Sequence, residues 1–326
     1  MKVTILGAGA WGTALAILLD KNGHAITLWG HDASRLEEVG RTGRNERYLP
    51  GVDLPKNWKF EPDLGGAAAE AEMIVAAVPS KAFRDVTKGL GDFGGVVVSV
   101  TKGIEHETGL TMCGVLAQTM PKARSGALSG PTFAQEVARG MPTAIVTASN
   151  DPAAADKIQE LFFRPEFRVY TSADLTGVEL GGALKNVVAI AAGVCDGLGF
   201  GDNAKAALIT RAMAEVRRLG VICGAQPETF TGLSGLGDLT VTCFSKLSRN
   251  RGFGQRLGKG EKLAELLSGM TTVAEGYPTS RSAYQLSKKH NISTPIIDEV
   301  YRMLYEGKNV VKGVRDLLSR DSKAED

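Results

Sequence analysis

Short apolar runs alternate with helical patterns along the first half of the chain. Seven of these runs are predicted strands: residues 3–6, 25–29, 73–78, 96–100, 127–129, 143–147 and 168–171. The runs 74–78 and 96–100 are apolar on both faces, which is typical of strands in a parallel sheet covered by helices. This alternation predicts the α/β fold class, with a doubly wound, Rossmann-type N-terminal domain.

After Thr171 the strand pattern disappears. Residues 174–222 show long helical patterns rich in Ala, Leu, Val and Gly, a Gly-rich region spans about 231–260, and helical patterns continue to Leu318. We therefore expect an α/β domain at 1–175, an all-α C-terminal domain at 176–318 and a disordered polar tail at 319–326.

The first predicted strand leads directly into a G-x-G-x-x-G motif formed by Gly7, Gly9 and Gly12. A helix is predicted from residue 11 to 22, with Gly23 as its left-handed cap, and the second predicted strand follows. The first glycine permits a tight turn, the second lets a pyrophosphate approach, and the third lets helix and strand pack closely. A glycine-rich turn can be purely structural, but the strand–helix–strand context favours dinucleotide binding.

The same segment has a rival interpretation, because residues 3–19 carry no charge. A signal peptide or membrane anchor would fit that property. Three glycines interrupt the run, Asp20 and Lys21 close it, and it is shorter than a membrane span. We expect a soluble, cytoplasmic chain without membrane insertion.

Composition narrows the range of partners. The formal net charge is +2, which gives no reason to expect nucleic acid as a partner. The four cysteines are far apart without a C-x-x-C motif, and the four histidines are equally scattered. We therefore predict neither a disulfide framework nor a metal site, as suits a reducing compartment.

A nicotinamide enzyme needs a group that exchanges a proton with the substrate hydroxyl. His24 and His290 lie in polar, turn-like stretches, and His106 lies between two glutamates. Lys185 is a lone lysine in an apolar helical segment, where desolvation would lower its pKa toward the range of a general base. A snorkelling lysine at a domain interface is the alternative, and this segment alone leaves both open.

Two predicted strand ends carry further candidates. Lys102 follows the strand 96–100, and ligands of open α/β sheets bind beyond the carboxyl ends of strands. Its alternative is an exposed loop lysine. Thr132 follows the strand 127–129 and could hydrogen-bond a substrate, although capping of the next helix is the more common role.

The Gly-rich region of the second half contains a Ser248-Arg249-Asn250 triplet. A hydroxyl, a guanidinium and an amide together suit a phosphate monoester. A solvated basic loop is the alternative. Asp238, in the same region, could orient a catalytic amine or cap a helix.

In their order along the chain, these motifs resemble those of the bacterial NAD(P)-dependent glycerol-3-phosphate dehydrogenases. The matching stretches are GAGAWG at 7–12, LWGHD at 28–32, VPS at 78–80, TKGIE at 101–105, LSGPTFA at 128–134, LKN at 184–186, GLSGLGDL at 232–239, SRN at 248–250 and EG at 275–276. The resemblance covers essentially the whole chain. It implies reversible hydride transfer between NAD(P)H and dihydroxyacetone phosphate, which gives sn-glycerol 3-phosphate, a precursor of glycerophospholipids.

The resemblance also implies residue roles. Lys185 matches the proton-transfer residue of the family. Substrate contacts are implied for Lys102, Gly130, Thr132, Lys185, Asp238, Ser248, Arg249 and Asn250. Besides the motif residues Gly7, Gly9 and Gly12, cofactor contacts are implied for Ala10, Trp11, His31, Lys102, Ala134, Arg249, Val273 and Glu275. A homodimer is also suggested, and no metal is required.

Two rival functions remain open. A β-hydroxyacid or 6-phosphogluconate-type dehydrogenase shares the predicted domain plan and a catalytic lysine. That group tends to place asparagine four residues after the lysine, where this chain has Ala189, with its asparagine at Asn186. A catalytically inactive nucleotide sensor is the second rival, but it would not need the lysines and the Ser-Arg-Asn triplet.

The end of the second predicted strand bears on the choice of cofactor. NAD enzymes usually place a carboxylate there to hold the ribose 2′-hydroxyl, but this strand ends at Trp29-Gly30. His31, Arg35 and Arg249 would suit a 2′-phosphate. We interpret Asp32 as the N-cap of a helix at 33–39, with its carboxylate turned toward backbone N–H groups. The sequence thus predicts that NADP(H) is preferred and NAD(H) is possible.

Overall fold

The computed structural model of the chain describes residues 1–269 and 274–321. An eight-stranded sheet in the order β3-β2-β1-β4-β5-β6-β7-β8 forms the N-terminal domain. Its strands are β1 (Lys2–Leu6), β2 (Ala25–Trp29), β3 (Lys59–Phe60), β4 (Met73–Ala76), β5 (Val96–Ser99), β6 (Arg124–Ser129), β7 (Thr143–Ser149) and β8 (Phe167–Ser172). All seven predicted strands are confirmed, with ends shifted by up to three residues. The two-residue β3 was not predicted, because so short a strand has no periodicity.

The pairing of the strands is mostly parallel. Neighbours from β3 through β6 are parallel, but β7 runs antiparallel to β6, and β8 is parallel to β7. The helices of this domain are α1 (Ala10–Lys21), α2 (Ala33–Thr42), α3 (Leu64–Ala68), α4 (Ser80–Lys88), α5 (Met112–Thr119), α6 (Ala134–Ala138) and α7 (Pro152–Phe162). The Rossmann-type N-terminal domain that the sequence predicts is confirmed.

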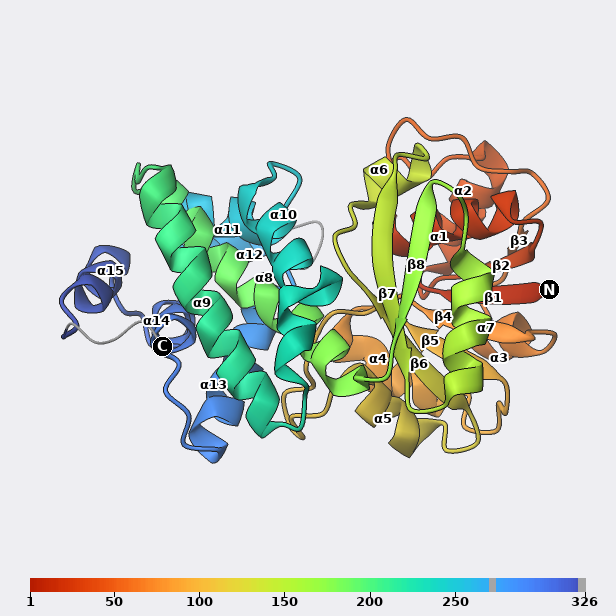
Figure 1. Cartoon of the computed structure of the whole chain (residues 1–326). Helices are drawn as coiled ribbons and strands as arrows, with labels where there is room; N and C mark the ends of the chain where they lie inside the picture. Colours follow the sequence, from red (N-terminus) through yellow and green to blue (C-terminus); the bar gives the residue numbers. More distant parts are fainter. Residues whose placement is uncertain (270–273, 322–326) are drawn as a thin grey trace.

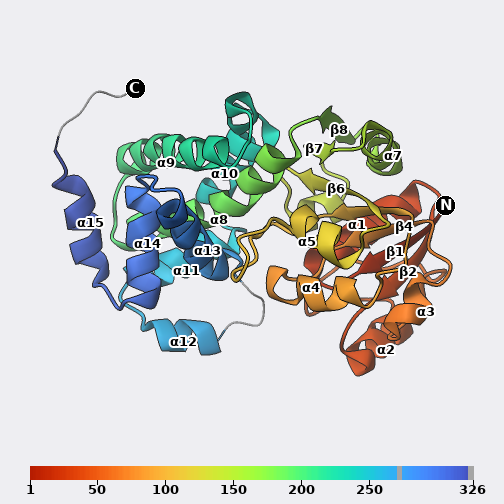
Figure 2. The same ribbon diagram turned by 90° about the horizontal axis from the view of Figure 1, so that it is seen from below.

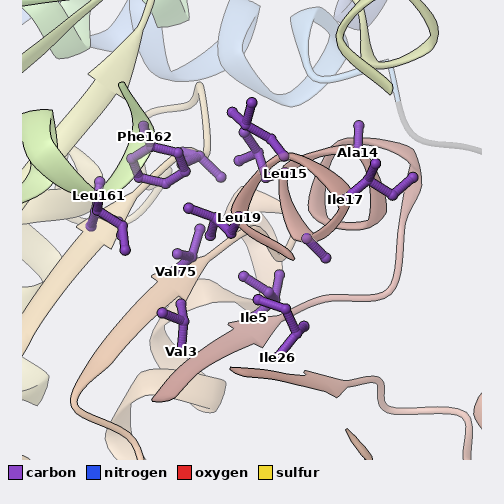
Figure 3. Close-up of a cluster of buried hydrophobic side chains, with 14 of the residues drawn as sticks. Val3, Ile5, Ala14, Leu15, Ile17, Leu19, Ile26, Val75, Leu161 and Phe162 are labelled. Atoms are coloured by element: carbon purple, nitrogen blue, oxygen red, sulfur yellow. The ribbon is translucent and has the colours of Figure 1, made fainter. Parts of the chain in front are cut away.

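Both faces of the sheet are buried. Val3 and Ile5 of β1 point toward α1 and α7, where they pack with Leu19 and Phe162 (Figure 3). Leu6, the next residue on the alternate face, belongs to a second cluster with side chains of α4 and α5. A strand with apolar residues on both faces can be covered on both sides, so the continuous apolar runs of the sequence follow from the three-layer packing.

The second half of the chain is helical. It contains α8 (Leu175–Gly197), α9 (Asp202–Ile222), a 3₁₀ turn η1 (Pro227–Thr231), a π turn η2 (Leu233–Gly237), α10 (Asp238–Phe244), α11 (Arg249–Gly258), α12 (Leu263–Ser268), α13 (Gly276–Lys289), α14 (Pro295–Tyr305) and α15 (Val310–Leu318). This confirms the predicted all-α C-terminal domain. Residues 322–326 of the predicted tail lie outside the described residues.

Helix α8 joins the two domains (Figures 1 and 2). Its first turns contribute Leu175 and Val178 to the core beneath the sheet, and from Leu180 onward it belongs to the core of the helical domain. It is long and apolar enough to cross a membrane, but 94% of the apolar window is buried within the protein. A central helix of a globular domain has the same properties.

Helices α8 and α11 are packed very closely. A side chain at Gly254 of α11 would collide with the backbone of Ile190 in α8. The glycine therefore allows the two backbones to approach each other. The close approach places the beginning of α11, where the Ser-Arg-Asn triplet lies, beside the middle of α8, where Lys185 lies.

Candidate active site

The turn between β1 and α1 has the geometry that the glycine motif predicts. Gly7 has φ +119°, and its N–H donates to the Trp29 carbonyl at 2.9 Å. Gly12 packs directly against the Gly7 carbonyl, where a side chain would not fit. At Gly9, by contrast, no described atom lies within 4 Å of the place where a Cβ would stand. Packing within the protein therefore explains Gly7 and Gly12, whereas Gly9 leaves open space above the turn.

The N-terminus of α1 faces that open space. No side chain among the described residues caps this helix. Its first N–H groups and its positive dipole end are available to an anion. The buried Trp11 Nε1 also has no hydrogen-bond partner in the described part of the chain. These residues fit a dinucleotide whose pyrophosphate lies against the turn.

The end of β2 confirms the predicted role of Asp32. Its Oδ1 accepts hydrogen bonds from the Arg35 N–H at 3.2 Å and from Ser34 Oγ at 2.9 Å, and it is the N-cap of α2. Both bonds lower the pKa of Asp32, and the bond from the Arg35 backbone N–H has the larger effect. The helix runs to Thr42, three residues beyond the predicted end. His31 is exposed beside the cap.

Two lysines and one aspartate form the centre of the site. Lys185 Nζ of α8 lies 2.7 Å from Asp238 Oδ1, and Lys102 Nζ lies 2.7 Å from Asp238 Oδ2. Asp238 is the first residue of α10 and is 1% exposed. One buried carboxylate therefore holds both ammonium groups, and the sequence-predicted residues Lys102, Lys185 and Asp238 are brought together from three distant segments.

Burial changes the acidity of Lys185. Desolvation lowers the pKa of this lysine, Asp238 opposes that shift, and the nearby charge of Lys102 adds to it; the net result is a pKa of about 8. An amine in this range is present both as ammonium and as free amine near neutral pH. It can therefore donate a proton in one direction of a reaction and accept one in the other.

Thr242 is part of the site although the sequence analysis did not identify it. Its Oγ1 accepts a hydrogen bond from Lys185 Nζ at 2.7 Å and donates to the Asp238 carbonyl at 2.6 Å. It lies one helical turn after Asp238 on α10, so the i, i+4 spacing was visible in the sequence. A threonine in an apolar helical stretch gave no other sign of function.

Lys102 also reaches the strand ends of the sheet. Its Nζ donates to the Gly130 carbonyl at 2.8 Å and to Thr132 Oγ1 at 3.4 Å. Thr132 itself donates to the Gly130 carbonyl at 3.0 Å. The structure thus places Gly130 and Thr132 beside the lysine pair, and Ala134 begins α6 close by in the chain. Thr132 is not the N-cap of that helix, since Phe133 occupies the N-cap position.

The Ser-Arg-Asn triplet begins α11, and its three side chains have different partners. Ser248 is the N-cap and accepts the Arg251 N–H at 3.2 Å. Asn250 donates to Asn186 Oδ1 and accepts the Gly276 N–H, both at 2.9 Å. Arg249 is exposed as a residue and makes no hydrogen bond or salt bridge with any described residue. Desolvation nevertheless lowers the pKa of its guanidinium, and the nearby charge of Glu275 opposes this shift. Of the three, Arg249 is the group most open to an anionic ligand.

Glu275 connects the helical domain with the sheet domain. Its carboxylate accepts the Ser80 N–H at 3.2 Å and Ser80 Oγ at 2.6 Å, at the start of α4. Burial raises the pKa of Glu275, and the bonds from Ser80 oppose this shift. The neighbouring cofactor candidate Val273 lies outside the described residues. Among those described, no three His, Cys, Asp or Glu side chains are grouped as metal ligands.

Comparison with known proteins identifies the family. The model of the NAD-dependent glycerol-3-phosphate dehydrogenase N-terminus matches residues 2–155, and the model of the C-terminus matches residues 174–315. A glycerol-3-phosphate dehydrogenase [NAD(P)+] of Syntrophotalea carbinolica is 48% identical over 331 residues, covering 100% of this chain and 99% of the relative. One of Geobacter sulfurreducens is also 48% identical, over 330 residues, covering 99% and 98%.

Solved structures agree with the sequence relatives. The crystal structure of glycerol-3-phosphate dehydrogenase from Coxiella burnetii has a TM-score of 0.95 and 38% identity, covering 98% of this chain and 99% of that one. Neither rival function predicted from the sequence is favoured by these matches. The two family models together cover both domains, and the motifs at 7–12, 101–105, 184–186 and 248–250 fall inside them. The chain belongs to the NAD(P)-dependent glycerol-3-phosphate dehydrogenase family of oxidoreductases.

Proposed function

We propose that this chain reduces dihydroxyacetone phosphate reversibly to sn-glycerol 3-phosphate, with Lys185 as the general acid and base. The observation that carries this assignment is the pair of lysines on one buried aspartate. When bound, the nicotinamide cofactor supplies or accepts the hydride at C2. All other requirements fall on the residues of the chain.

The proton is supplied by Lys185. Reduction at C2 produces an oxyanion, to which the Lys185 ammonium donates a proton; in the reverse direction the free amine accepts the proton of the C2 hydroxyl. Asp238 and Thr242 fix the direction of the amine, because each forms a 2.7 Å bond with Nζ. The side-chain exposure of Lys185 is 9%, so little water competes for its proton.

Lys102 stabilises the charge that develops. The two lysines and Asp238 together carry a net charge of +1, so the site has a positive charge to offset the oxyanion. Because Lys102 is held by Asp238 and by the Gly130 carbonyl, it needs no reorganisation during the reaction.

The substrate phosphate is proposed to bind at the start of α11. Arg249 offers a guanidinium without a competing salt bridge from described residues. The hydroxyl of Ser248 remains able to donate, since its cap bond uses it as acceptor. The Asn250 amide uses its oxygen to accept from Gly276 and one hydrogen to donate to Asn186. We propose that its second amide hydrogen donates to the phosphate.

We further propose that NADPH is preferred over NADH. Asp32 turns its carboxylate into α2, which removes the usual acceptor for a ribose 2′-hydroxyl. His31 and Arg35 then surround the expected place of a 2′-phosphate. Arg35 lies 3.4 Å from Asp32 and donates to the Tyr48 hydroxyl at 3.0 Å, which orients its guanidinium. The ratio of kcat/KM for the two cofactors tests this, and a preference for NADH would contradict it.

A turnover assay tests the function as a whole. Consumption of NADPH with dihydroxyacetone phosphate is expected, whereas β-hydroxyacids and 6-phosphogluconate should not be oxidised with NADP⁺. Binding of NADPH without turnover of dihydroxyacetone phosphate would favour the sensor instead. On the family resemblance we also propose a cytoplasmic homodimer, which sedimentation of the purified chain would test.

A further inference from the structure

The segment that follows α2 packs against the cofactor turn. Gly43 ends the helix in the left-handed conformation, and Leu49 anchors the segment in the core with 1% exposure. Arg44 and Asp53 close its base through a 2.7 Å salt bridge. The segment is therefore fixed at both ends and in its middle. It lies outside the glycine motif and contains none of the residues to which the family resemblance gives a role.

Asn45 connects this segment to the turn. Its side chain is buried, and Nδ2 donates to the Ala8 carbonyl and to Thr13 Oγ1, both at 2.9 Å. Ala8 lies between the first two glycines of the motif, and Thr13 lies in the first turn of α1. The single amide group therefore bridges the two sides of the turn.

The bond to Ala8 determines which way the next N–H points. The peptide between Ala8 and Gly9 is planar and trans, so its C=O and N–H point in opposite directions. With the carbonyl directed at Asn45, the Gly9 N–H is directed away from Asn45. A peptide next to two glycines has little intrinsic preference for one orientation, because glycine adopts both signs of φ at low cost.

We propose that Asn45 is a positioning residue for the cofactor: by holding the Ala8 carbonyl, it keeps the Gly9 N–H directed at the pyrophosphate. The inference rests on dinucleotide binding at this turn. An anion held by backbone N–H groups needs those groups aligned before it binds, since ordering a flexible turn on binding would weaken the affinity. Asn45 acts through the turn and is not a catalytic residue.

Two substitutions separate the donor function from the shape of the side chain. Asn45→Asp keeps the shape but cannot donate to the Ala8 carbonyl, and Asn45→Leu keeps the bulk without any polar atom. Direct titration with NADPH, followed by fluorescence or calorimetry, should show Kd raised by about tenfold, the size expected for loss of a buried hydrogen bond that orients a ligand site. At saturating NADPH, kcat and the KM for dihydroxyacetone phosphate should stay close to wild type.

A matched control excludes general destabilisation. Thr119→Val removes a buried hydroxyl that pairs with Thr87 at 2.8 Å in the same domain but does not touch the turn. It should lower Tm to a similar extent without changing the Kd for NADPH. An equal rise of Kd in this control would overturn the proposal. So would an unchanged Kd in the Asn45 variants.

Thr13 provides a second test that leaves Asn45 in place, in case the Asn45 variants fail to fold. Thr13→Val removes the second acceptor of the amide and should raise Kd, whereas Thr13→Ser keeps the hydroxyl and should restore the affinity. Equal affinities in these two variants would contradict the proposal. Failure of wild type to bind NADPH would instead contradict the proposed function, so the two failures are distinguishable.

Discussion

Replacement of Lys185 is the most direct test of the proposed chemistry. In Lys185→Met, the apolar length of the side chain stays in the core of the helical domain while the amine is lost. Asp238 would not become an unpaired buried charge, because Lys102 remains 2.7 Å from its other oxygen. Thr242 also keeps its bond to the Asp238 carbonyl. We therefore expect a folded protein that lacks one proton-transfer group.

The magnitude follows from what the amine does. A positioned general acid or base contributes typically 10²–10⁴-fold to the rate, which corresponds to about 2.7–5.4 kcal/mol in activation free energy. Lys102 still supplies a positive charge near the oxyanion in the variant, so we take the lower end of this range as the smallest expected loss of rate. The kcat should fall at least about 10²-fold in Lys185→Met and Lys185→Ala, while the Kd for NADPH stays near wild type.

The chain offers a matched control for this substitution. Lys308 also shares a buried carboxylate with a second cation, because Glu299 binds both Lys308 and Arg302 at 2.6 Å. Lys308→Met therefore removes the same group from an ion-pair cluster that also includes Asp316, 2.6 Å from Lys308, and that has no contact with the lysine pair. It should keep wild-type kcat. Near-normal kcat in the Lys185 variants, or an equal loss in Lys308→Met, would refute the assignment.

Three further predictions follow from the site and the helical core. Because the pKa of Lys185 is lowered to about 8, kcat/KM for glycerol 3-phosphate oxidation should rise with pH through this value, and kcat/KM for dihydroxyacetone phosphate reduction should fall. If the two reactions did not depend on pH in opposite directions, the role of the amine would be contradicted. Arg249→Ala should weaken substrate binding by about 1.5–3 kcal/mol and raise KM for dihydroxyacetone phosphate far more than for dihydroxyacetone, whereas equal losses would mean that Arg249 does not bind the phosphate. Burial raises the pKa of Glu215 from 4.5 to about 7, so the native state holds this proton more tightly than the unfolded state does. The Tm of wild type minus that of Glu215→Gln should therefore decline as pH rises from 4.5 to 7, and a Tm difference that stays constant over this range would argue against the shift.

Local pattern was sufficient for much of the fold. The seven predicted strands, the turn at the first glycine motif and the cap at Asp32 each depend on residues within a few positions of one another. The antiparallel direction of β7 was not predictable in this way. Its apolar run is the same whichever way the strand points, and the direction is decided by the path of the connecting chain and by the bonds to β6.

The site could be predicted only as separate candidates, because its bonds join residues far apart in the sequence. Lys102 and Asp238 are 136 positions apart, and Lys185 and Asp238 are 53 apart. On its own segment Lys185 was equally consistent with a snorkelling lysine, and the sequence could not show that its amine is buried against Asp238.

Helix α8 explains physically why these distant residues meet. It begins in the core beneath the sheet, close to the strand ends that carry Lys102, and continues into the helical domain, where it presents Lys185 to Asp238 at the start of α10. A change in the packing of this one helix would move the amine relative to both domains. Lys102 of the sheet domain and Asp238 of the helical domain both act on the Lys185 amine, so its pKa depends on how the two domains pack together.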